Sequence, residues 1–217
     1  MQTFNVICKE EITGMSVIGT YRKILCYGDS NTYGYDARSP FGDRFPDEYC
    51  WPYRLGRALD AVTVNAGING RCIPRSDYAI AVELASVKRA LPCDLIIVML
   101  GSNDILSDVS SSAEEIAEKM KAFLYAFTRA APDAAFLLIA PPEIAFSPEI
   151  RNCSVQLSLC YKALAREMGI LFADAGEWAL PLAWDGVHFT AEGHRIFAER
   201  TAALLRTFSG SGRAEPS

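Results

Sequence analysis

Five short apolar runs alternate with longer amphipathic stretches along most of this chain of 217 residues. Such runs, rich in aliphatic side chains, are typical of strands buried on both faces of a sheet. They lie at residues 24–27, 62–65, 95–100, 135–140 and 170–173. The intervening stretches have helical periodicity and lie at residues 53–60, 76–90, 113–130, 149–168 and 191–208. Strands joined by helical crossovers predict an α/β fold, with a five-stranded parallel sheet covered by helices on both faces.

The same pattern suggests one domain over residues 21–208, which suits a chain of this length. The segments 111–115 (S-S-A-E-E) and 190–192 (T-A-E) place a hydroxyl cap and early carboxylates where two of the helices would begin. Residues 1–20 form an N-terminal extension of uncertain role. The domain could begin at Met15, or Thr3–Cys8 could add an edge strand. Residues 209–217 are polar and rich in glycine, and we expect them to be a disordered tail.

Composition excludes several classes of partner. The net charge is −5, and lysine and arginine are not concentrated in any segment, which argues against a nucleic-acid partner. No run approaches the roughly 18 apolar residues of a membrane span, so no membrane partner is expected.

The seven cysteines contain no C-x-x-C pair, which indicates reduced thiols and neither a zinc site nor a disulfide framework. The charged residues 9–11 interrupt any secretory signal, and a cytoplasmic protein is expected.

Four polar motifs stand out from this background, and three of them directly follow apolar runs. They read G-D-S-N at 28–31, G-I-N-G at 67–70, G-S-N-D at 101–104 and D-G-V-H at 185–188. Parallel strands end at one edge of a sheet, and ligands bind at that edge. We therefore expect these separate turns to meet in one site.

The first and last motifs together offer a nucleophile and its base. A serine hydroxyl needs a base to accept its proton and a third group to orient that base. The chain has two histidines, and His188 lies three residues after Asp185. In a turn, that carboxylate can accept the imidazole Nδ1 proton and leave Nε2 facing Ser30. The motifs thus predict Ser30 as nucleophile, His188 as base and Asp185 as the orienting group.

Acyl transfer also needs hydrogen-bond donors aimed at the developing oxyanion. Three candidates follow the first three strands: the backbone N–H of Ser30, a glycine N–H in the second motif, and the side-chain amide of Asn103. The residues alone leave both Gly67 and Gly70 open as the glycine donor.

Each candidate also has an ordinary structural reading. Ser30 could cap a helix and Asn103 could close a turn. Asp185 could be a cap, and His188 a partly buried histidine with a structural partner. His194 could join Asp185 and His188 in a metal site, but no further ligand is placed nearby. We therefore expect no metal. No organic cofactor is expected either, because a serine that forms a covalent acyl-enzyme needs none. The co-occurrence of four motifs favours the chemical interpretation.

Taken together, the four motifs resemble those of the SGNH, or GDSL-like, hydrolase superfamily over roughly residues 24–206. The resemblance implies a three-layer, flavodoxin-like fold. It also implies a triad of Ser30, His188 and Asp185, with an oxyanion hole formed by Ser30, Gly70 and Asn103. The absence of a second glycine after the serine argues against the G-x-S-x-G elbow of an α/β-hydrolase.

The family's donor glycine follows the second strand by several residues and precedes a polar side chain, which favours Gly70, before Arg71, over Gly67. Asn31 stands where the name motif G-D-S-L has leucine. That position varies widely in the family.

More narrowly, the sequence Y-G-D-S-N-T-Y-G-Y and the segment D-G-V-H-F-T-A-E-G-H resemble the arylesterase and acyltransferase branch. This resemblance implies a serine esterase for small esters with a short acyl group such as acetyl. Acyl transfer to alcohols and carbohydrate deacetylation are variants of that chemistry. It makes a small-molecule ester the expected partner and leaves a homo-oligomer open.

Two rival functions remain. A thioesterase or lysophospholipase would use the same machinery with a different pocket. A non-catalytic α/β module would instead hold a phosphate or nucleotide with the backbone amides of residues 28–32.

Overall fold

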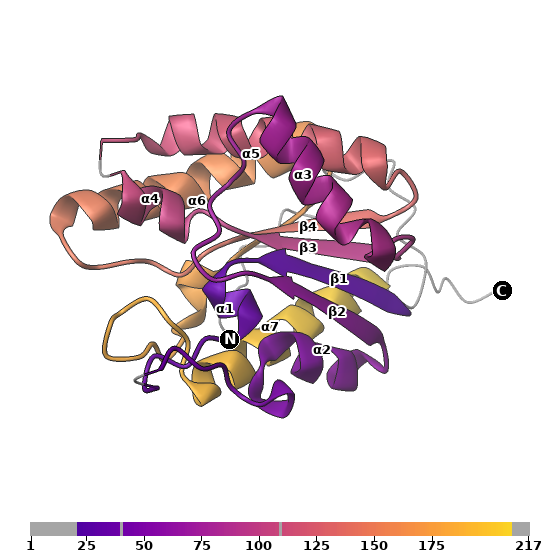
Figure 1. Ribbon diagram of the computed structural model, residues 1–217, viewed down its shortest axis with the longest axis horizontal. Coiled ribbons are helices and arrows are strands. Elements are labelled where there is room, and N and C mark those ends of the chain that lie inside the picture. The colour runs from indigo at the N-terminus through magenta and orange to yellow at the C-terminus, as the bar shows by residue number, and fades with distance from the viewer. Residues whose placement is uncertain (1–20, 40, 109, 210–217) are drawn as a thin grey trace, which may run out of the picture.

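The computed structural model describes residues 21–39, 41–108 and 110–209 (Figure 1). Five strands form one parallel sheet in the order β2-β1-β3-β4-β5. Their bounds are β1 Lys23–Gly28, β2 Val62–Gly67, β3 Leu95–Met99, β4 Ala135–Ala140 and β5 Leu171–Asp174. The predicted five-stranded parallel sheet is confirmed, with each strand within two residues of its predicted end.

Seven α-helices surround the sheet within these residues. They are α1 Ser30–Tyr33, α2 Trp51–Leu59, α3 Asp77–Val87, α4 Ser102–Ser107, α5 Ala113–Ala130, α6 Pro148–Met168 and α7 Ala191–Ser209. Short 3-10 turns occur at η2 Asp47–Tyr49, η3 Lys88–Ala90 and η4 Ala175–Trp178. The five long helices were predicted, whereas α1 and α4 were not. None of the helices in the described ranges combines the length and apolarity needed to cross a bilayer.

The predictions for residues 1–20, including Met15 and the edge strand Thr3–Cys8, lie outside the described residues. So do those for residues 210–217. Ser209, which we assigned to the tail, is instead the last residue of α7.

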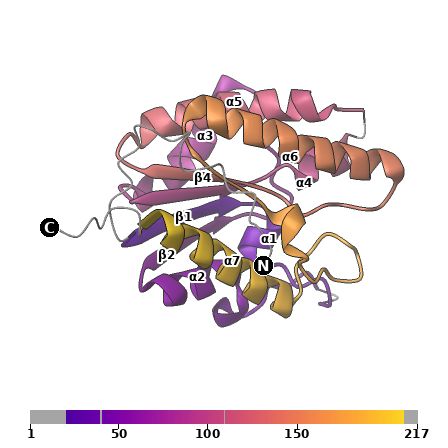
Figure 2. The same ribbon diagram turned by 180° about the vertical axis from the view of Figure 1, so that it is seen from behind.

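Helices cover both faces of the sheet, as expected for strands buried on both sides (Figures 1 and 2). Successive side chains of a strand point to opposite faces. In β1, Leu25 and Tyr27 belong to the cluster that α3, α5 and α6 cover, while Ile24 and Cys26 belong to the cluster under α2 and α7. The result is a three-layer α/β/α fold with one apolar core on each face.

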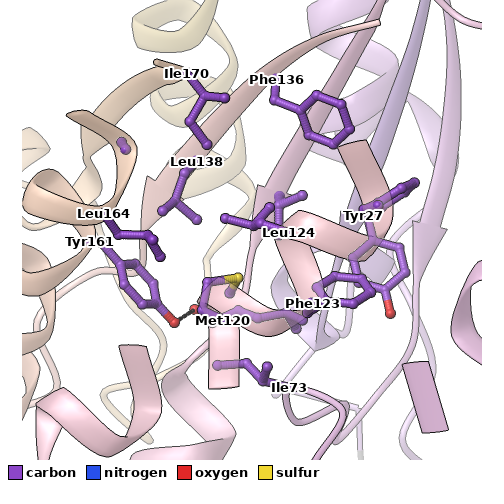
Figure 3. Close-up of a cluster of buried hydrophobic side chains, with 14 of the residues drawn as sticks. Tyr27, Ile73, Met120, Phe123, Leu124, Phe136, Leu138, Tyr161, Leu164 and Ile170 are labelled. Carbon is purple, nitrogen blue, oxygen red and sulfur yellow. Dashed lines mark hydrogen bonds between the residues drawn. The ribbon is translucent and has the colours of Figure 1, made fainter. Parts of the chain in front are cut away.

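The core under α5 is rich in aromatic rings (Figure 3). Tyr27 of β1 lies 5.2 Å from the ring of Phe123 and 5.7 Å from that of Phe127, both on α5. On the neighbouring α6, the Tyr161 hydroxyl donates a hydrogen bond of 3.2 Å to the carbonyl of Leu100. Leu100 directly follows β3, so this bond fixes the end of that strand just before the G-S-N-D motif.

The strand order locates the site within the fold. From β1 the chain crosses to β2 on one side, and the later strands are added on the other side, beginning with β3. In open α/β sheets, ligands bind at such a change of direction, beyond the carboxyl ends of the strands. The short helices α1 and α4, which follow β1 and β3, carry Ser30 and Asn103, respectively.

Candidate active site

Ser30 is the first residue of α1 and lies two residues beyond the end of β1. Asp29 caps this short helix, because its Oδ1 accepts a hydrogen bond of 3.0 Å from the Asn31 N–H. Asp29 is fully buried. Burial raises its pKa to about 6, although the Asn31 hydrogen bond and the nearby His188 and Arg71 act in the opposite direction. Asp29 therefore organises the turn that presents the serine hydroxyl.

The helix α1 rests directly on the end of β2, at Gly67. A Cβ atom at position 67 would lie 2.0 Å from the backbone nitrogen of Tyr33, so the position has no room for any side chain. The second motif thus needs its first glycine for this close approach of two backbone segments.

His188 forms a hydrogen-bonded line with Ser30 and with Asp185, which belongs to the same D-G-V-H motif at residues 185–188, here called the acid motif. Its Nε2 lies 3.0 Å from Ser30 Oγ, and its Nδ1 lies 2.7 Å from Asp185 Oδ2. Because the carboxylate can only accept at Nδ1, the neutral ring carries its proton there and leaves the Nε2 lone pair for the serine hydroxyl. The structure therefore brings together the three residues that the sequence singled out.

The acid motif is held in shape by its own hydrogen bonds. Asp185 Oδ1 accepts bonds of 3.0 Å from the backbone N–H groups of Val187 and His188, and Ala183 N–H donates to the His188 carbonyl at 2.7 Å. Gly186 makes the tight turn with φ of +65°. Burial alone would raise the pKa of Asp185, but the hydrogen bonds from the His188 ring and from these two amides outweigh it and lower the pKa. The orienting group is therefore a carboxylate at neutral pH.

The two glycines of the second motif differ in what their amides do. Gly67 N–H donates to Asn65 Oδ1 at 2.9 Å. Gly70 N–H has no such partner among the described residues. Gly70 has φ of +71°, in the left-handed region, and nothing lies within 4 Å of a Cβ built there. Its conformation, rather than lack of space, is what favours glycine at position 70.

Asn103 lies on α4 and reaches the second motif. One hydrogen of its side-chain amide bonds to the Arg71 carbonyl at 3.0 Å. An amide group has two donor hydrogens, so the second remains for a ligand. The adjacent Asp104 also ties these segments together, since its Oδ2 accepts a bond of 3.0 Å from Ile73 N–H.

Arg71 is a structural residue of the site that the sequence did not reveal as such. Its buried guanidinium donates to the carbonyls of Gly28 and Ala66, at the ends of β1 and β2, and lies 3.3 Å from the Glu83 carboxylate. An arginine directly after a turn glycine resembles an exposed polar residue. No local signal in the sequence shows this role, because the bond to the Gly28 carbonyl joins residues 43 positions apart.

His194 lies apart from this site. It is buried on α7, where its Nδ1 accepts a hydrogen bond of 3.3 Å from Trp51 N–H. Burial lowers its pKa to about 3, helped by the nearby Arg54 and Arg44. Among the described residues no group of three potential metal ligands occurs, and His194 does not join Asp185 and His188.

Two aromatic side chains border the site. The Tyr35 ring lies 4.5 Å from the His188 ring. Trp184 is 84% exposed, and its indole N–H donates to the Ala37 carbonyl at 3.0 Å. These contacts connect the loop after α1 with the acid motif.

Comparison with known proteins identifies the family of the chain. The profile of the GDSL-like lipase/acylhydrolase family matches residues 26–196. The GDSL lipase Rv0518 of Mycobacterium tuberculosis is 26% identical over 191 residues, which cover 84% of this chain and 80% of that protein.

Solved structures with the same fold include two esterases. The carbohydrate acetylesterase Est24 of Sinorhizobium meliloti is 27% identical, with a TM-score of 0.77, covering 86% of this chain and 99% of that one. The aryl esterase of M. smegmatis is 25% identical, with a TM-score of 0.77 and the same coverage. The family profile spans most of the chain, all four motifs lie within it, and the fold is the SGNH one. The chain therefore belongs to the GDSL-like lipase/acylhydrolase family and is a carboxylic ester hydrolase.

Proposed function

We propose that this protein is a serine esterase that hydrolyses small esters with a short acyl group through a covalent acyl-enzyme. The observation that carries the proposal is the distance of 3.0 Å between Ser30 Oγ and His188 Nε2, with Asp185 on the other ring nitrogen at 2.7 Å. This is the hydrogen-bonded line that nucleophilic serine catalysis requires.

In the first half-reaction, Ser30 Oγ attacks the ester carbonyl carbon while His188 Nε2 takes the hydroxyl proton. The carbonyl oxygen becomes an oxyanion, which the N–H groups of Ser30 and Gly70 and the amide of Asn103 stabilise. The carbonyl reforms as the bond to the leaving oxygen breaks. His188 gives its proton to that oxygen, and the alcohol departs, leaving an acyl group on Ser30.

In the second half-reaction, water attacks the acyl carbonyl and gives a proton to His188 Nε2. Collapse of the second oxyanion releases the carboxylic acid and returns the proton to Ser30 Oγ. An alcohol in place of water gives acyl transfer by the same steps. Asp185 remains ionised throughout and stabilises the imidazolium that forms.

The two esterase neighbours support the substrate class. Their names specify a carbohydrate acetylesterase and an aryl esterase. The first name specifies an acetyl ester and the second an aryl ester, and we infer an acetyl ester as the preferred substrate here. The six described cysteines are free thiols, which supports a reducing, cytoplasmic location.

The environment of Ser30 disfavours the phosphate-binding alternative. The helix α1 has only four residues, and its Asn31 amide is already bonded to the buried Asp29. A carboxylate at that position repels an anion. The Ser30 hydroxyl, meanwhile, is directed at a histidine, which a phosphate site does not need.

Kinetics of a serine variant test the proposal. Ser30→Ala removes the nucleophile, and its kcat for an aryl acetate should fall by at least about 10³-fold. The matched control is Ser154→Ala, which removes another buried serine hydroxyl. This hydroxyl lies on α6 and accepts a hydrogen bond from the Ile144 N–H. The control variant should retain wild-type kcat. Undiminished turnover by Ser30→Ala would refute the proposal, and comparing acetyl, octanoyl and thioester substrates separates it from a lysophospholipase or thioesterase.

A further inference from the structure

Asn31, the residue after the proposed nucleophile, is bonded to the segment that carries the proposed base. The residue is 3% exposed. Nδ2 donates to the Val187 carbonyl at 3.0 Å, and Oδ1 accepts from the Phe189 N–H at 2.8 Å. The two bonds thus hold the backbone at the residue before His188 and at the residue after it.

These bonds differ in their reach from the hydrogen bonds that Asp185 makes to the same segment. The hydrogen bonds made by Asp185 stay within residues 185–188, so they fix the shape of the turn but not its distance from α1. Over the part of the chain that the structure describes, no other side chain joins α1 to residues 185–190 by hydrogen bonds, apart from the Ser30–His188 contact itself. Asn31 therefore ties the base to the helix of the nucleophile.

The chemistry of this residue is specific. One side chain must present a donor to a carbonyl and an acceptor to an N–H at the same time, which a side-chain amide does. A leucine, which the G-D-S-L motif has at this position, has similar volume and neither group. It would leave a buried N–H and a buried carbonyl without partners, and such groups are costly to leave unpaired.

We infer that Asn31 is a positioning residue that holds the His188 backbone against α1 and so sets the distance between Nε2 and the Ser30 hydroxyl. This inference rests on the proposed function. Rates of reactions between oriented groups fall about 100-fold when one group is misplaced by about 1 Å. Loss of the two bonds therefore acts on the chemical step and not on substrate binding.

The test is Asn31→Leu, with kcat and KM measured separately on an aryl acetate. We expect kcat to fall about 10- to 100-fold while KM changes less than about threefold. The matched control is Thr201→Val, which removes a buried side-chain to backbone bond of 2.8 Å within α7. It should lose comparable stability but keep wild-type kcat, which separates positioning from a general loss of packing.

A spectroscopic measurement adds a readout independent of turnover. The chain has two histidines, and His188 alone has a ring N–H bonded to a carboxylate, so its low-field proton signal can be assigned with His188→Gln. We expect Asn31→Leu to weaken or broaden that signal through exchange with water, and Thr201→Val to leave it unchanged. If Asn31→Leu does not fold, Asn31→Ala is measured in the same two ways.

The outcomes are distinguishable. A folded Asn31 variant with wild-type kcat and an unchanged low-field signal would overturn the positioning role. If Ser30→Ala also retained activity, the proposed function itself would fail. If Ser30→Ala were inactive while Asn31→Leu turned over normally, only the present inference would fail.

Discussion

At the scale of single residues, the proposed chemistry depends on which donor hydrogens are bonded within the protein and which are left for the substrate. Asn103 uses one amide hydrogen to bond the Arg71 carbonyl, which fixes the side chain and leaves the other hydrogen for the oxyanion. A donor held in this way needs no reorganisation when charge develops, and this is the condition under which such donors contribute most.

Replacing this donor should affect the transition state selectively. Asn103→Ala is expected to lower kcat for an aryl acetate by about 10²- to 10³-fold with little change in KM. Asn152→Ala, which removes an exposed amide on α6, is the matched control and should behave as wild type. An Asn103→Ala enzyme with normal kcat would show that the oxyanion is stabilised by backbone groups alone.

At the scale of elements, α2 and α7 are connected through His194. Trp51 is the first residue of α2, where a backbone N–H has no partner inside the helix. His194 on α7 accepts this N–H at 3.3 Å, with the rings of Phe45 and Phe189 edge-on beside the imidazole. Protonation of Nδ1 would destroy the acceptor and bury a charge among apolar rings.

Stability should therefore depend on pH through this residue. The pKa of His194 is about 3 in the folded chain and about 6.5 when unfolded, so below pH 6.5 the unfolded state binds a proton that the folded state excludes. The free energy of unfolding is expected to fall by up to about 1.4 kcal/mol per pH unit as the pH decreases from about 6.5 toward 3. Above pH 6.5 this contribution is fully present.

The free energy of unfolding in urea is compared between wild type and His194→Asn at about pH 7, 6 and 5. The asparagine Oδ1 can accept the Trp51 N–H near the position of Nδ1, and it does not titrate. The buried Asp29 acts in the opposite sense, because its raised pKa favours folding at lower pH, but it is common to both proteins. The wild type should lose more stability than the variant on acidification. Identical pH dependence in the two proteins would contradict the role given to His194.

At the scale of the whole molecule, the elements that could be predicted are those whose residues show a regular apolar pattern. The five strands were identified as short apolar runs and the helices α2, α3, α5, α6 and α7 by their periodicity, and α5 and β4 have the predicted bounds. The helices α1 and α4 have four and six residues, too few to show a helical period, and they lie inside motifs that resemble turns.

The candidate site was predictable only in part. His188 could be selected because the chain has two histidines, and Asp185 because it lies three residues before one of them. Ser30 could be selected because its motif directly follows an apolar run. Asn31 and Arg71 could not, since the contacts that define them are distant in sequence: Asn31 bonds residues 156 and 158 positions away, and Arg71 bonds a carbonyl 43 positions away. Such contacts depend on how β1, β2 and the acid motif meet, which no local pattern contains.

Covalent labelling tests most directly whether these distant segments meet to activate one hydroxyl. A fluorophosphonate reacts with a serine whose proton a nearby base removes, and peptide mass analysis then identifies the modified residue. The account predicts one adduct on Ser30, abolished in Ser30→Ala and strongly slowed in His188→Ala. An active enzyme that forms no adduct on Ser30, or forms it at the same rate without His188, would contradict the account.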